Sequence, residues 1–168
     1  MAISEFASGR AGYAQVEIQI TGLYPALARW AKSDPMFNKE IRQASVKLIG
    51  QLVTDVQATA QGTGSRQAIE SARGFRARPD RVPIIKLNSS SGFVSVSRPN
   101  RRRKNKVTRG DVFFGAEFGS DRLRQFPGRS ARVGSGNKGY FFWPTIEDKA
   151  ETIRTEYLKA LDRILYNL

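Results

Sequence analysis

The feature that most constrains this fold is a run of four aromatic residues, Tyr140 to Trp143, between Gly139 and Pro144. Each aromatic side chain can remove roughly 150–250 Å² from water, so the run requires a substantial core. Pro144 cannot donate to a sheet ladder, and its fixed φ suits the first turn of a helix. We therefore expect a structural anchor here, made of Tyr140, Phe141, Phe142 and Trp143.

An amphipathic helix is predicted directly after this anchor. Thr145 and Asp148 match the Thr-x-x-acid pattern of a capping box. Apolar residues then follow at spacings of three and four, the pattern of one helix face. These residues are Ile146, Ala150, Ile153, Tyr157, Leu161, Ile164 and Leu168.

A second, longer helix is predicted in the first half of the chain. Asp34 is expected to be its N-cap, with Pro35 at the first helical position. Helical spacing then continues for about six turns. The residues that carry it are Phe37, Ile41, Ala44, Leu48, Leu52, Val56 and Ala60.

Short apolar runs predict strands around 16–20, 82–87, 93–97 and 112–118. Strands with hairpin connections, bracketed by helices, favour an α+β fold. We expect one domain over 1–168, with a mostly antiparallel sheet of about four strands packed against the long central helix and the C-terminal helix. Residues 1–13 are expected to be a flexible arm, 98–110 the tip of a long projecting hairpin, and 119–139 a loop rich in Gly and Arg.

The composition limits the possible chemistry. The chain has 168 residues, no Cys and no His, which removes thiolate chemistry, the commonest general base and the commonest transition-metal ligands. The best catalytic candidates are then Asp111 and Glu117, which a magnesium nuclease could use. We favour a structural role, in which Glu117 ends a strand and pairs with a nearby arginine. We expect no enzymatic activity, cofactor or metal.

The net charge of +13 comes from the middle of the chain, because residues 73–138 hold seventeen Lys/Arg against four Asp/Glu. Such a segment can neutralise phosphates, or it can face an acidic protein or solvent. The sequence leaves both open. The candidate protein or DNA contacts are Arg98, Arg101, Arg102, Arg103, Lys104, Lys106 and Arg109.

Two motifs resemble a known family. The first runs from Gly110 to Gly119 and contains Gly115-Ala116-Glu117-Phe118-Gly119, followed by Phe126-Pro127. The second is 139–144 with the C-terminal helix. Together they resemble the neck or tail-completion proteins of long-tailed double-stranded-DNA phages, over nearly the whole chain. Where many relatives have Pro-x-x-Thr-Gly-x-Leu after the long helix, this chain has 62–66, Gly-Thr-Gly-Ser-Arg.

The resemblance implies a structural virion protein at the head–tail junction, assembled in the host cytoplasm. Such a tail-completion or tail-terminator subunit forms a ring, expected to hold six copies, between the head connector or stopper and the tail tube. Double-stranded DNA would pass through its bore, and no membrane is involved. Glu117, Phe126 and the aromatic run would be structural anchors. The alternative is a free basic protein that binds nucleic acid, whose affinity falls steeply with salt.

Overall fold

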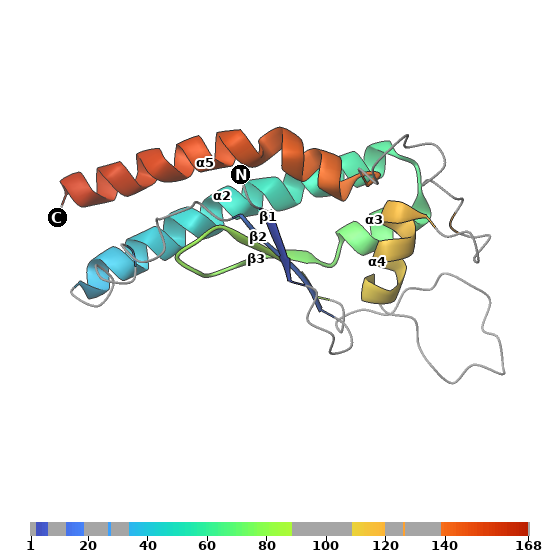
Figure 1. Cartoon of the computed structure of the whole chain (residues 1–168), viewed down its shortest axis with the longest axis horizontal. Coiled ribbons are helices and arrows are strands. Elements are labelled where there is room, and N and C mark those ends of the chain that lie inside the picture. Colours follow the sequence, from blue (N-terminus) through green and yellow to red (C-terminus); the bar gives the residue numbers. More distant parts are fainter. Residues whose placement is uncertain are drawn as a thin grey trace.

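The computed structural model describes residues 3–6, 13–18, 27, 34–88, 109–119, 126 and 139–167. Two long helices dominate this part of the chain, α2 (Pro35–Gly62) and α5 (Phe142–Tyr166). They lie side by side and run in opposite directions, with the short strands on one side of α2 (Figure 1).

Helix α2 begins as its sequence predicts. Asp34 has an extended backbone, and its Oδ1 accepts hydrogen bonds from the N–H groups of Met36 (2.7 Å) and Phe37 (3.3 Å). These bonds satisfy two of the N–H groups that a helix start leaves without a partner. Its buried stripe is Phe37, Ile41, Ser45, Ile49, Leu52, Val56 and Ala60.

Helix α5 presents the predicted stripe to the core as far as Ile164, and Leu168, the last residue of the prediction, lies outside the described residues. Ile146, Ala150, Ile153, Tyr157, Leu161 and Ile164 are all buried, while most of the intervening residues are exposed. The described part of the chain contains no helix that is both long and apolar enough to cross a membrane. The apolar stripe instead packs along α2.

The strands are β1 (Ile3–Phe6), β2 (Tyr13–Ile18), β3 (Phe75–Arg78) and β4 (Ile84–Asn88), paired antiparallel in the order β1-β2-β4-β3. β4 pairs with β2 through Val16 opposite Ile85, and with β3 through Phe75 opposite Leu87. Phe75, Ile85 and Leu87 alternate toward the core, where they join the apolar stripe of α2. β1 and β3 are therefore the edge strands.

Two short helices, α3 (Arg66–Ala72) and α4 (Arg109–Phe118), pack together near the C-terminal end of α2 (Figure 1). Ser65 caps α3, because its hydroxyl accepts a hydrogen bond from the N–H of Ala68 at 3.4 Å. The N-terminus of α5 lies at the same end of the molecule. Three segments distant in sequence thus meet there: the end of α2 with α3, then α4, and the start of α5.

The predicted α+β fold, with a mostly antiparallel sheet of about four strands and a long projecting hairpin packed against two helices, is wrong in the weight it gives to the sheet, because helices dominate the described residues. In the described residues the strands span four to six residues each, whereas α2 and α5 span 28 and 25. The strand predicted at 112–118 is helix α4. Its buried residues are Val112, Phe113, Ala116 and Glu117, a helical spacing, whereas a strand would have buried every second residue.

Several predicted boundaries also change. The expected flexible arm contains β1, and β2 begins at its last residue, Tyr13. The expected hairpin partner of 82–87, residues 93–97, lies outside the described residues, and β4 pairs with β2 and β3 instead. Residues 109 and 110, assigned to the hairpin tip, begin α4. Within 119–139 the structure describes only 119, 126 and 139.

Candidate functional site

The start of α5 is held by the carboxylate of Glu117, from the last turn of α4. Glu117 is fully buried. Its oxygens accept hydrogen bonds from three consecutive backbone N–H groups, those of Phe141 (3.1 Å), Phe142 (3.0 and 3.1 Å) and Trp143 (2.8 Å). The residue that links the two motifs of the sequence is therefore an acid bound to a helix terminus.

This arrangement provides hydrogen-bond acceptors for the N–H groups at the start of α5. Its N-cap residue, Phe141, has no side chain that can accept a hydrogen bond, and its first turn contains no acidic residue. The first N–H groups of a helix lack partners, and the helix dipole places partial positive charge there. Glu117 supplies both the acceptors and the negative charge from another helix, so its charge is compensated in the core.

The predicted capping box is wrong. Thr145 lies inside α5, where its hydroxyl donates to the carbonyl of Phe141 at 2.6 Å. Pro144 is in the first turn, where its missing N–H costs little. Glu117 also differs from its prediction, because it ends a helix and binds backbone amides. Among the described residues, the ion pairs do not include it.

Gly139 lets the chain approach this carboxylate. Its φ is +74°, in the region that residues with a Cβ rarely adopt. A Cβ at this position would lie 2.1 Å from Glu117 Oε1 and 2.8 Å from the Cβ of Trp143. Only glycine therefore fits between the buried carboxylate and the first turn of α5.

The aromatic run packs into a cluster built from three elements. Phe142 stacks on Phe75 of β3, with ring centroids 4.5 Å apart and an angle of 10° between the rings. Phe113 of α4 makes T-shaped contacts with Phe75, Phe141 and Phe142 at centroid distances of 5.3, 6.2 and 5.4 Å. Trp143 and Tyr140 are partly buried against the same core. The aromatic run thus packs in the core, where it contacts β3 and α4.

Phe126 belongs to the same unit. It is 5% exposed, and a Cβ placed on Gly115 of α4 would lie 2.6 Å from its ring. Gly115 therefore leaves the space that the Phe126 ring fills. The Gly-Ala-Glu-Phe-Gly motif thus contacts both Phe126 and the start of the aromatic run in the fold.

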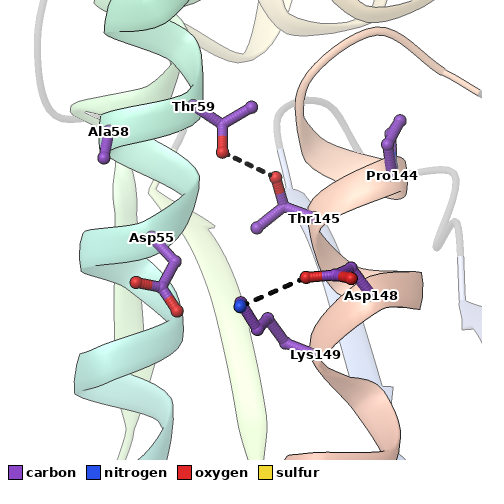
Figure 2. Close-up of a pocket in the computed structure, with 7 residues that line it drawn as sticks. All are labelled: Asp55, Ala58, Thr59, Pro144, Thr145, Asp148 and Lys149. Carbon is purple, nitrogen blue, oxygen red and sulfur yellow. Dashed lines mark hydrogen bonds and ion pairs between the residues drawn. The ribbon is translucent and has the colours of Figure 1, made fainter.

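A surface groove runs along the facing sides of α2 and α5 (Figure 2). The hydroxyls of Thr59 and Thr145 are hydrogen-bonded across it at 3.0 Å. Asp148 and Lys149 form an exposed ion pair at 3.2 Å, of a kind that contributes about 1 kcal/mol at most. The bond between Thr59 and Thr145 thus joins the two helices across the groove. Among the residues that the structure describes, no three His, Cys, Asp or Glu side chains gather to hold a metal ion.

Tyr157 joins the middle of α5 to the connection between β3 and β4. Its hydroxyl donates a hydrogen bond to the carbonyl of Arg81. Burial, and to a smaller extent the negative charge of Asp80, raise the pKa of Tyr157 well above its ordinary value. The phenol therefore stays protonated and keeps this bond through the physiological pH range.

Most of the predicted basic contacts cannot be placed. Arg98, Arg101, Arg102, Arg103, Lys104 and Lys106 lie outside the described residues. Arg109 is described, and it begins α4, where a Cβ on Gly74 would lie 3.2 Å from its Cδ. The Arg109 side chain thus lies against Gly74, just after the end of α3.

Three exposed arginines were not singled out from the sequence. Arg73 follows α3, and Arg76 and Arg78 lie on the edge strand β3. The sequence does indicate them, because Phe75 and Ala77 alternate with Arg76 and Arg78, the pattern of a strand with one basic face. This pattern is weaker than that of the run 98–109, in which the basic residues are more closely spaced.

The chain was compared with protein-family models, curated proteins and solved structures, and none of them matches it.

Proposed function

We propose that this chain is a structural subunit of the neck of a long-tailed double-stranded-DNA phage. It would form a ring, expected to hold six copies, at the junction between the head connector and the tail tube. In this position it completes the tail, docks the head and leaves a bore for DNA.

The observation that carries the proposal is the contact between Glu117 and the start of α5. The resemblance to neck proteins rests on two sequence motifs separated by about twenty residues, and this carboxylate joins them through four hydrogen bonds. Phe126 and Gly115 add a second contact within the same unit. The motif residues thus form one packed unit, which supports a structural role for them.

The same contact weighs against a nuclease that uses Glu117. A carboxylate that binds a catalytic metal needs oxygen lone pairs directed at the ion and a site open to substrate. Both oxygens of Glu117 are buried and accept bonds from backbone amides. Its position therefore supports a role in holding α4 against α5.

The outer side of α4 offers a surface for a neighbouring subunit. Phe114 is 50% exposed and stacks on Phe118, with ring centroids 6.4 Å apart. Glu117 fixes the helix that carries this pair. A second copy that covered Phe114 would remove apolar surface from water, which favours association.

Electron microscopy of the purified protein tests this proposal. We expect ring-shaped particles with a central opening, and Phe114→Ser should reduce their number. The matched control is Tyr166→Ser, because Tyr166 is 91% exposed at the far end of α5. Rings that withstand both changes would place the interface elsewhere. Single small particles under every condition would contradict the proposal and favour the free basic nucleic-acid-binding protein.

A further inference from the structure

Residues 73–86, which contain the edge strand β3, carry a larger excess of positive charge than any helix of the described part. This segment contains four arginines and one lysine against one acidic residue, Asp80. Arg73 forms an ion pair with Glu70 of α3, and Arg78 forms one with Asp80, both at the surface. Arg73, Arg76 and Arg78 are exposed. Phe75, between them, is buried and packs in the core. This surface, formed by the three arginines, is called the β3 ridge below.

Arg76, in the middle of the β3 ridge, is held in place by the backbone. Arg76 Nη1 donates hydrogen bonds to the carbonyls of Phe75 (2.7 Å) and Arg73 (2.9 Å). A guanidinium group has five N–H donors, so these two bonds leave those on Nε and Nη2 for other acceptors. A side chain that is already fixed loses less conformational entropy when it binds.

The spacing of the arginines suits a chain of anions. Arg76 and Arg78 are two residues apart on one strand, so they share a face at a separation of about 7 Å. Successive phosphates of a nucleic-acid backbone have a comparable separation. Lys86 of β4 lies directly opposite Arg76 in the register, which widens the basic surface by one strand.

An added protein strand is a poorer fit to this edge. The carbonyls of Arg73 and Phe75 already accept bonds from Arg76, and the carbonyl of Arg78 accepts one from the N–H of Asp80 at 2.9 Å. A strand that extended the sheet would need such carbonyls as acceptors. Recognition here therefore depends on the side chains.

We infer that the β3 ridge binds the phosphate backbone of double-stranded nucleic acid without reading its sequence. Single strands are less suitable, because they are usually bound by aromatic side chains on which bases stack, and Phe75 is buried. The inference does not depend on ring formation. It also involves residues other than the basic run 98–109.

Fluorescence anisotropy with a labelled DNA duplex, measured over a series of salt concentrations, tests the inference. The variant Arg73→Gln/Arg76→Gln/Arg78→Gln should bind about tenfold more weakly or worse at low salt. Its slope of log K against log salt should become shallower by about 2–3, since each phosphate contact contributes about 0.9. The control, Lys39→Gln/Arg42→Gln/Lys47→Gln, removes three exposed charges from α2 and should leave the slope unchanged.

Two further measurements separate the outcomes. Arg73→Lys/Arg76→Lys/Arg78→Lys keeps the charge and should retain most of the affinity, whether or not the glutamine variant folds. Polyglutamate, at the same concentration of charges, should displace the duplex poorly. Four results would each overturn the inference. The unaltered chain could bind no duplex, or the β3 and α2 variants could lose equal affinity for it. The lysine variant could bind no duplex, or polyglutamate could displace the duplex efficiently. The last result would assign the surface to an acidic protein.

Discussion

Glu117 Oε1 accepts a hydrogen bond from the backbone N–H of Trp143 at 2.8 Å, across 26 residues of sequence. This is the shortest of the bonds that the carboxylate forms with the start of α5. It fixes the last turn of one helix to the first turn of another. The stability of this end of the molecule therefore depends on one buried charge.

Replacing that charge should destabilise the fold. Glu117→Gln keeps the shape but removes the negative charge, and it turns an NH₂ group toward backbone N–H donors. We expect the free energy of unfolding to fall by about 2–3 kcal/mol, measured by urea denaturation. Glu147→Gln, an exposed position in the second turn of α5, is the control and should change it by about 0.5 kcal/mol or less. Equal effects of the two variants would refute the role of Glu117.

A methyl group at Gly139 should disturb the same contact. Gly139→Ala places a Cβ 2.1 Å from Glu117 Oε1 at a φ of +74°, so we expect a loss of about 2–4 kcal/mol in thermal or urea unfolding. Gly50→Ala is the matched control, because nothing lies within 4 Å of its Cβ position inside α2. That variant should stabilise the chain by about 1 kcal/mol.

Tyr157 should make stability depend on alkaline pH. Because its pKa is raised in the folded chain, the unfolded chain loses the phenolic proton first as the pH passes about 10. The folded state then binds more protons than the unfolded state, so its stability is full below pH 10 and falls as the pH rises above it. Urea denaturation from pH 8 to 11 should show this fall.

Tyr157→Phe separates this effect from other alkaline titrations. The variant should lose about 1 kcal/mol at pH 8, because the carbonyl of Arg81 loses its hydrogen bond. Its stability should then fall less steeply than that of the unaltered chain above pH 10. Parallel curves for the two proteins would contradict the assignment.

Ser45 should be a site of easy stabilisation. It is fully buried on α2, and its hydroxyl has no hydrogen-bond partner among the described residues. Ser45→Ala removes an unsatisfied polar group and improves helix propensity, so we expect a gain of about 1 kcal/mol. Ser71→Ala is the control: Ser71 is as buried, but its hydroxyl donates to the carbonyl of Gln67 at 2.7 Å, and no gain is expected.

Periodicity predicted both long helices from the sequence, and capping predicted the start of α2. Asp34 and Pro35 mark the start of α2, and the stripe from Ile146 to Ile164 marks the buried face of α5. Both signals are local, because helical hydrogen bonds join residues four apart. Both helices can therefore be recognised from the sequence without knowing the rest of the fold.

The candidate site was predictable only in part. Residues 112–118 contain apolar residues that suit a strand or a helix, and packing of Phe113 against Phe75 and Phe142 decides between them. The capping of α5 by Glu117 is a contact between distant segments, which no spacing rule reveals. The pairing of β4 with β2, about seventy residues earlier, was missed for the same reason.

The most direct test of the central claim is native mass spectrometry of the purified chain, with and without duplex DNA. A neck-ring subunit predicts a closed oligomer, expected at six times the 18.7 kDa of the chain, without DNA. A monomer at every concentration, whose mass changes only when duplex is added, would contradict the claim and favour a free nucleic-acid-binding protein.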